Sequence, residues 1–313
     1  PAITAGGAAV LCVALGGVLT RIFGDHSTGV VVAAAGGLPM AFVCGLYVVP
    51  GGLDRPNLLL ACALVLVVAA SSIMVLGTGV TVFIAAGSAA ALGAGATLFA
   101  TLVAHPAAGI AAGTAAFALA LLSALPRLTI QLARLPLPQV PGSAEDLKED
   151  TGFPDYAAIE RRAGLAHAHM TGMIIGCGAV AAICAVVVAL PGTMFGIVLG
   201  VVITLVMLLR SRTYANGTQA VALLSAGMLA AAGLVAGWMV NADDAVLNLW
   251  VFGSLMLLAV AALVLGVVVP NQRFSPVMRR LVDICEAVLI VAVLPLALAV
   301  MDLYNTVRQI PGG

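Results

Sequence analysis

The sequence predicts an all-α membrane protein that crosses the bilayer about ten times. Of its 313 residues, 63% are hydrophobic and only 8% are charged, too few polar groups to cover a water-soluble protein of this size. Its apolar runs are about 20 residues long, which is the length of helix that crosses a hydrocarbon core of about 30 Å. The runs do not alternate polar and apolar residues, as the strands of a membrane barrel would. They are therefore predicted to be helices, which satisfy their backbone hydrogen bonds internally.

Ten spans follow one another along the chain, bounded by charged residues or by Gly, Pro, Asn and Asp. The predicted spans are residues 2–20, 28–49, 57–75, 79–104, 107–125, 171–190, 193–209, 217–240, 245–269 and 281–301. Connections such as Gly77-Thr78 and Pro191-Gly192 are so short that the neighbouring spans must form tight hairpins. Pro39 and Pro295 lie inside spans, which are expected to bend there.

A charged segment separates the first five spans from the last five. It covers residues 126–170 and holds 11 of the 26 charged residues of the chain. The sequence therefore divides into a first helix bundle (1–125), a charged arm (126–170) and a second helix bundle with a short tail (171–313).

The arm is expected to begin extended and to end as a helix. Prolines at 136, 138 and 141 favour polyproline II backbone. Asp155 is a suitable N-cap for a helix that starts near Tyr156. The helical pattern continues to Met170, so this helix is predicted to run unbroken into the sixth span.

Lys and Arg collect at one set of helix ends, which the positive-inside rule assigns to the cytosol. The arm, Arg210 with Arg212, and Arg279 with Arg280 all fall on that side. The C-terminal tail is then expected outside, and counting back through five spans places Pro1 outside as well. A cytosolic N-terminal region would need one helix more, so the parent protein is expected to have eleven spans.

The membrane interior lacks the groups that chemistry or ion coupling would need. Ionisable residues in spans usually mark proton relays, ion paths or substrate sites, and none lies inside a predicted span. Asp283 and Glu286 lie near the start of the last helix, where they are expected to reach water, and Arg279 is expected to pair with Asp283.

No catalytic residue, cofactor site or metal site is predicted. His167 and His169 are two residues apart and thus on different helix faces, and the six cysteines contain no CxxC pair. The net charge of zero gives no case for nucleic-acid binding.

Glycines at helical spacing mark faces where backbones can approach closely. These faces are predicted to pack against helices of the same chain or, alternatively, against another subunit. The glycines are Gly109, Gly113, Gly172, Gly176, Gly192, Gly196, Gly200, Gly233 and Gly237.

Three segments carry a resemblance to a known family. They are Arg134-Leu135-Pro136-Leu137-Pro138, Ala163-Gly164-Leu165, and the last helix with Ser275-Pro276, Arg279-Arg280, Asp283, Glu286, Pro295-Leu296, Leu303-Tyr304 and Arg308. In this order they resemble the EccD family, multi-span subunits of the mycobacterial type VII (ESX) secretion machinery. The resemblance implies eleven helices in the bacterial inner membrane after a small ubiquitin-like cytosolic domain. It also implies two EccD copies around a lipid-filled vestibule, assembled with EccB, EccE and the ATPase EccC.

The sequence thus predicts a non-catalytic scaffold subunit of a secretion complex. Partner contacts are expected in the arm, at Arg134, Pro136, Pro138, Asp155, Arg161 and Arg162. The alternative is a secondary transporter for a neutral or hydrophobic solute, which would need coupling groups in the membrane. A membrane enzyme such as a prenyltransferase would need clustered acidic residues.

Overall fold

The structure, a computed structural model, describes residues 1–50, 54–103, 105–133, 156–241, 249–250, 253 and 276–303. In this part of the chain, nine helical segments are long and apolar enough to cross a membrane. They coincide with nine of the ten predicted spans, which confirms the all-α polytopic class. The remaining predicted span, residues 245–269, lies largely outside the described residues.

The N-terminal half contains four spans, the second of which changes its helical form midway. The helices are α1 (Ala2–Arg21), α2 (His26–Val31), the π-helix η1 (Val32–Gly37), α3 (Leu38–Val48), α4 (Arg55–Leu76) and α5 (Val80–Leu102). The π-helix ends just before Pro39, which has no N–H for the carbonyl four residues earlier. A π-turn shifts that bond to the amide five residues on, so the second span continues past its proline.

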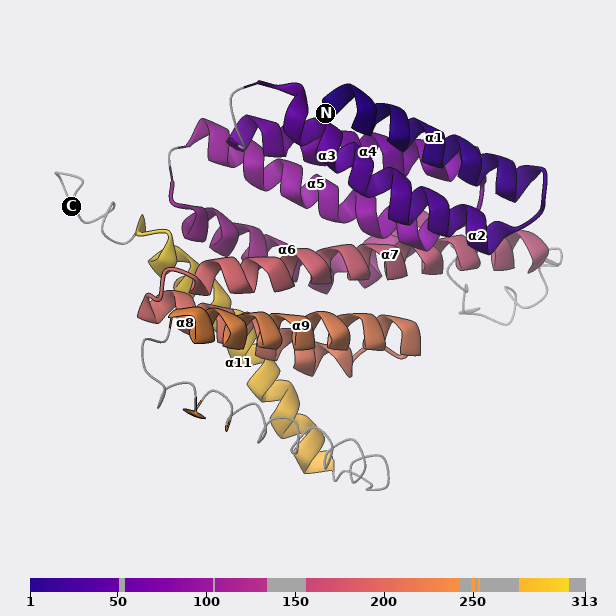
Figure 1. Cartoon of the computed structure of the whole chain (residues 1–313). Coiled ribbons are helices and arrows are strands. Elements are labelled where there is room, and N and C mark those ends of the chain that lie inside the picture. The colour runs from indigo at the N-terminus through magenta and orange to yellow at the C-terminus, as the bar shows by residue number, and fades with distance from the viewer. Residues whose placement is uncertain are drawn as a thin grey trace, which may run out of the picture.

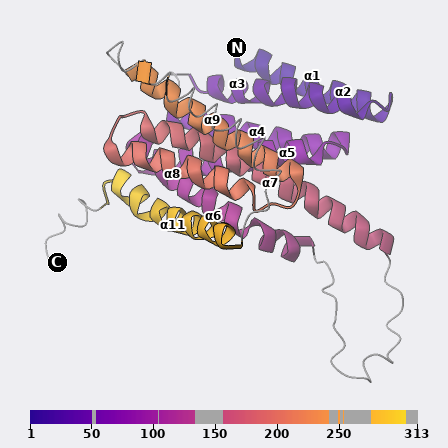
Figure 2. The ribbon, with the colours of Figure 1, turned by 90° about the horizontal axis from the view of Figure 1, so that it is seen from below.

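The C-terminal half is built around one long helix. Its helices are α6 (Ala107–Ala133), α7 (Tyr156–Ala189), α8 (Met194–Ser211), α9 (Gly217–Asn241) and α11 (Pro276–Val300). α7 packs against α5, α6, α8 and α9. Figure 1 shows α7 crossing the molecule between the N-terminal helices and α8, α9 and α11. In the view of Figure 2, α1 to α3 and α11 again lie on opposite sides.

α7 is a single helix of 34 residues, as the sequence predicts. At 1.5 Å per residue it is about 50 Å long, about 20 Å more than a hydrocarbon core requires. Most side chains between Glu160 and His169 are exposed. From Thr171 onward, buried side chains recur along the helix. The exposed first turns therefore project from the bundle, and we call the end of the bundle from which they project the arm side.

α6 was predicted to end at Leu125, but it continues through Pro126 to Ala133. Proline has no N–H to donate to the carbonyl four residues earlier, which here belongs to Leu122. The hydroxyl of Tyr214, in the connection between α8 and α9, donates to this buried carbonyl at 3.3 Å. The tertiary contact replaces the lost helical bond, so the arm predicted to begin at residue 126 starts as part of α6.

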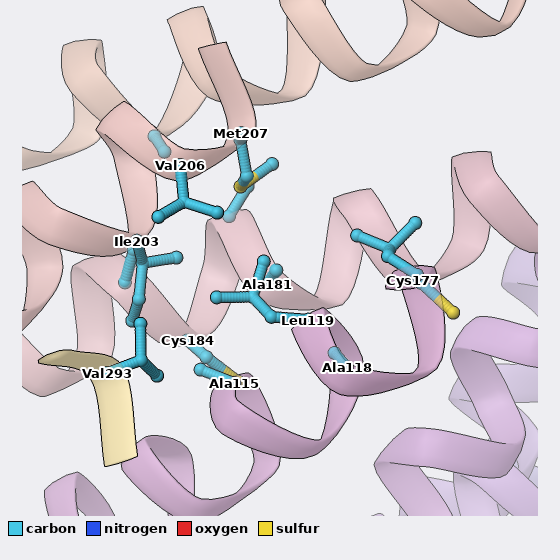
Figure 3. Close-up of a cluster of buried hydrophobic side chains, with 14 of the residues drawn as sticks. Ala115, Ala118, Leu119, Cys177, Ala181, Cys184, Ile203, Val206, Met207 and Val293 are labelled. Carbon is cyan, nitrogen blue, oxygen red and sulfur yellow. The ribbon is translucent and has the colours of Figure 1, made fainter. Parts of the chain in front are cut away.

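The main core lies where α6, α7, α8, α9 and α11 meet. Figure 3 shows small side chains such as Ala115 and Ala118 of α6 and Ala181 of α7 facing larger ones such as Ile203 and Met207 of α8. A second cluster, which contains the fully buried Phe83, joins α1, η1, α4 and α5. Alanine lets helix axes come close, so much of this interior is filled by backbone and by short side chains.

Candidate functional site

The predicted partner-binding residues lie only partly within the described structure. Arg161 and Arg162 are exposed on the first turns of α7. The other four, Arg134, Pro136, Pro138 and Asp155, lie outside the described residues. The candidate site is therefore built from α7 and from the helix ends that meet it on the arm side.

Hydrogen bonds fasten α7 to the start of α9, at the point where α7 enters the bundle. Nε2 of the buried Gln219 donates to Oγ1 of Thr171 at 2.9 Å, and the Thr171 hydroxyl donates to the carbonyl of His167 at 2.9 Å. One turn outward, Nδ2 of Asn216 lies 2.9 Å from Nε2 of His167. We call these four residues the arm latch. Sequence analysis considered the two histidines only as metal ligands, and the structure gives His167 a different partner.

Charged side chains fasten α8 to α11 on the same side. Arg212 pairs with Asp283 at 2.5 Å, and Glu286 lies 4.0 Å from Arg210 and 3.8 Å from Arg212. We call these four residues the ionic cluster. Asp283 was expected to pair with Arg279 of its own helix, whose side chain lies outside the described part of the structure; the structure pairs Asp283 with Arg212, which α8 brings within reach.

The prediction that Glu286 reaches water is wrong, because only 8% of the residue is exposed. Glu286 lies one turn deeper along α11 than Asp283, on the face that packs against α8. The Arg210 side chain is also largely covered, and its Nε has no hydrogen-bond partner in the described part of the chain. A buried carboxylate thus balances a buried guanidinium at the edge of the bundle.

Tyr214 connects the ionic cluster to α6. Burial raises the pKa of its phenol, and the hydrogen bond and positive charge of Arg210 partly offset that increase. The neutral phenol is the form that can donate to the carbonyl of Leu122. Because the pKa is higher in the folded protein, this contribution to stability is present below about pH 10 and is lost as the pH rises through the folded-state pKa.

Replacing Tyr214 by phenylalanine is expected to lower the free energy of unfolding by about 1–3 kcal/mol, because it leaves the buried carbonyl of Leu122 without a donor. Pro126→Ala should rescue this variant, since an alanine at this position would supply the missing helical N–H. Chemical unfolding of both single variants and of the double variant in detergent tests the coupling. Strictly additive losses would show that the two residues do not share this carbonyl.

The backbone of α7 lies close to the backbones of α5 and α8 at glycine positions. A Cβ at Gly172 would lie 2.7 Å from the carbonyl oxygen of Thr81, and one at Gly176 would lie 2.5 Å from that of Ala85. Both oxygens belong to α5. Gly200 of α8 is similarly close to the carbonyl of Ala185 in α7, at 2.8 Å. These contacts lie within the chain and leave no room for a side chain.

The other predicted packing glycines fall into three groups. Gly196 of α8 and Gly233 of α9 also press against α7, at Val188 and Val186. Contacts of ordinary van der Waals length surround Gly109, Gly113 and Gly237. Gly192 was predicted to pack within a helix face, but it lies in the turn between α7 and α8 with φ of +71° and open space around it. Its role is conformational, because glycine adopts positive φ without a steric penalty.

The sequence analysis missed the closest helix contact of the N-terminal half. A Cβ at Gly45 of α3 would overlap the backbone of Leu60 and Ala61 in α4. The signal was present, since Ala41 and Gly45 are small residues four apart and both are buried. Asn57 lies beside this contact and donates to the carbonyls of Leu46 and Val49 at 2.8 and 2.9 Å.

Two apolar grooves open on the flanks of the bundle. One, of about 370 Å³, lies between α5 and α6 beside Met301, and the other, of about 460 Å³, lies between α7 and α9. Each contains one hydroxyl residue, Thr114 or Ser225, whose proton is donated to a carbonyl of its own helix. The side chains of both grooves therefore offer hydrocarbon surface rather than free hydrogen-bond donors.

Comparisons with known proteins agree with this architecture. The family model described as the EccD-like transmembrane domain matches residues 1–310. The chain is 28% identical over 230 residues to the ESX-1 secretion system protein EccD1 of Mycobacterium tuberculosis, covering 64% of this chain and 44% of that relative. It is 29% identical over 212 residues to the ESX-4 protein EccD4 of the same species, covering 66% and 44%. The chain thus spans less than half the length of these relatives.

Solved structures of ESX complexes share the fold. A structure of protomer 1 of the ESX-3 core complex contains a chain that matches with a TM-score of 0.79 at 22% identity, over 97% of this chain and 69% of that one. A chain of a MycP5-free ESX-5 inner membrane complex matches with a TM-score of 0.66 at 21% identity, over 84% and 62%.

Proposed function

Because the chain belongs to the EccD family, we propose that it is a non-catalytic membrane subunit of a type VII secretion complex. The observation that carries this function is α7, a single helix that links an exposed, charged extension to both halves of the bundle. On the arm side, the arm latch joins α7 to α9 and the ionic cluster joins α8 to α11. This arrangement suits a subunit that receives a partner on one side and holds a fixed shape in the membrane.

Its proposed partners are a second EccD copy, EccB, EccE and the ATPase EccC. The arm (126–170) would face the cytosol, where the ATPase acts, and the C-terminus would face the periplasm. Asn241 and Pro276 lie at opposite ends of the bundle: α9 runs antiparallel to α8, with Gly227 beside Leu208, whereas Asp283 of α11 pairs with Arg212 at the end of α8. This separation supports one further crossing by the predicted span at residues 245–269.

The proposed role includes enclosing lipid. The two grooves support it, because hydrocarbon walls without free side-chain donors favour acyl chains over polar solutes. A vestibule between two copies of the subunit would then be lined by the same kind of surface.

Replacing Arg161 and Arg162 together by glutamate is expected to reduce copurification of the partner subunits by about tenfold, the effect of losing about 1.4 kcal/mol of binding free energy. Both side chains are exposed, so the fold of the subunit should survive. Pull-down from membranes in mild detergent, with size-exclusion chromatography of the subunit, provides the measurement.

The matched control is replacement of both arginines by lysine, which keeps the charge and should retain most of the copurification. Undiminished recovery of the partners with the glutamate variant would contradict docking through these residues. If the wild-type protein is extracted from the membrane only as a monomer or a dimer, this result would contradict the scaffold function itself.

A further inference from the structure

In the outer pair of the arm latch, Asn216 and His167, the structure fixes which side chain donates the hydrogen bond and which accepts it. Asn216 precedes the first turn of α9, and its Oδ1 accepts the backbone N–H of Thr218 at 2.8 Å. This bond fixes the orientation of the amide, so that Nδ2, a donor, is the atom 2.9 Å from Nε2 of His167. A donor opposite a ring nitrogen requires a lone pair there. His167 can therefore close the latch only as neutral imidazole with its proton on Nδ1.

Protonation of His167 removes this acceptor. The imidazolium ring carries a proton on each nitrogen, so Nε2–H would face the N–H groups of Asn216. Rotating the amide by half a turn would offer Oδ1 to the ring, but it would leave the N–H of Thr218 facing the amide nitrogen. Either arrangement loses one hydrogen bond, at the root of the exposed part of α7.

Among the described residues, no carboxylate forms an ion pair with His167. α5 (Val80–Leu102) and α9 (Gly217–Asn241) contain no titratable residue, and the α7 positions three and four residues from His167 are Ala163, Gly164, Met170 and Thr171. The titratable groups that α6, the α8 end and α7 itself present on this side are Arg127, Arg210, Arg212, Tyr214, Glu160, Arg161, Arg162 and His169. Of these, Glu160 is the single acid, and it lies seven residues, about two turns, before His167.

We propose that the arm latch is a protonation-sensitive fastening, closed when His167 is neutral and loosened when it is protonated. The inner pair, Gln219 and Thr171, has no titratable group and is buried, so it holds α7 to α9 in both states. Protonation thus frees the exposed turns of α7 and the first turn of α9 without separating the helices. The loss of one hydrogen bond corresponds to a change of about two- to tenfold in local opening.

Hydrogen–deuterium exchange of the full-length protein in lipid nanodiscs tests the proposal. The exchange is measured in peptides that cover residues 159–169 and 216–220. The key variant is His167→Gln, whose side-chain oxygen accepts from Asn216 at any pH. At about pH 8, this variant and the wild type are expected to exchange alike. At about pH 5.5, the wild type is expected to exchange about two- to tenfold faster than His167→Gln. Comparing variants at one pH cancels the intrinsic chemical rate.

Two further variants make the test specific. His169→Gln changes a histidine that bonds the Leu165 carbonyl of its own helix, and it should follow the wild type at both pH values. Asn216→Ala should exchange fast at both, without a pH response. Equal exchange of the wild type and His167→Gln at about pH 5.5 would overturn the proposal. A pH response that survives in Asn216→Ala, or disappears in His169→Gln, would overturn it too.

Discussion

Replacing Gly176 by valine is expected to push α7 away from α5 and to lower the free energy of unfolding by about 3 kcal/mol, the upper part of the range for overpacking. A Cβ here would lie 2.5 Å from the carbonyl oxygen of Ala85 and 3.0 Å from the backbone nitrogen of Ala89. It would also overlap Oγ of Ser88, which could rotate away. The two backbone atoms cannot move without shifting all of α5.

Gly7→Val is the matched control, because an added Cβ at Gly7 meets nothing within 4 Å. Both substitutions place valine in a membrane-spanning helix, so their difference isolates packing from helix propensity. Unfolding in mixed detergent micelles measures both. Equal losses of stability would show that α7 and α5 are not held at this distance by Gly176. Since α5 belongs to the N-terminal half, loosening this contact should also weaken the link between the arm and that half.

Replacing Glu286 by glutamine is expected to cost about 3 kcal/mol, because it leaves the guanidinium of Arg210 buried without a countercharge. The carboxylate of Glu286 lies 4.0 Å from Arg210 and 3.8 Å from Arg212, and its side chain is 11% exposed. Glutamine keeps the shape, so the change removes mainly the charge. We expect α11 to separate from α8 first at this end, which cysteine cross-linking between the two helices would detect together with the loss of stability.

Asp283→Asn provides the comparison within the same ionic cluster. Its side chain is 59% exposed, so water can solvate both partners when the pair is broken, and the loss should be about 1 kcal/mol or less. A double variant with methionine at both Arg210 and Glu286 should recover most of the stability, since an apolar pair of similar volume needs no countercharge. If Asp283→Asn costs as much as Glu286→Gln, burial does not set the strength of these pairs.

Most of the fold could be predicted because a membrane restricts the choices of a chain. Apolar runs of about 20 residues without charges have one stable form in lipid, the helix, so nine spans and the continuous α7 could be read from residue order. Helix ends were less predictable. Proline disfavours a helix interior, yet α6 continues past Pro126, and the Tyr214 hydroxyl, 92 residues away in the chain, satisfies the carbonyl of Leu122 there.

The composition and order of residues determined by themselves that this protein is a helical membrane bundle with one charged arm, and that glycine faces join its helices. Tertiary structure alone decided which helix each face meets, that Glu286 is buried against α8, and that His167 faces Asn216. The physical reason is the distance along the chain over which each interaction acts. Hydrophobicity and helical hydrogen bonding act within one segment and are written in it, whereas an ion pair or an interhelix hydrogen bond depends on where a distant segment packs.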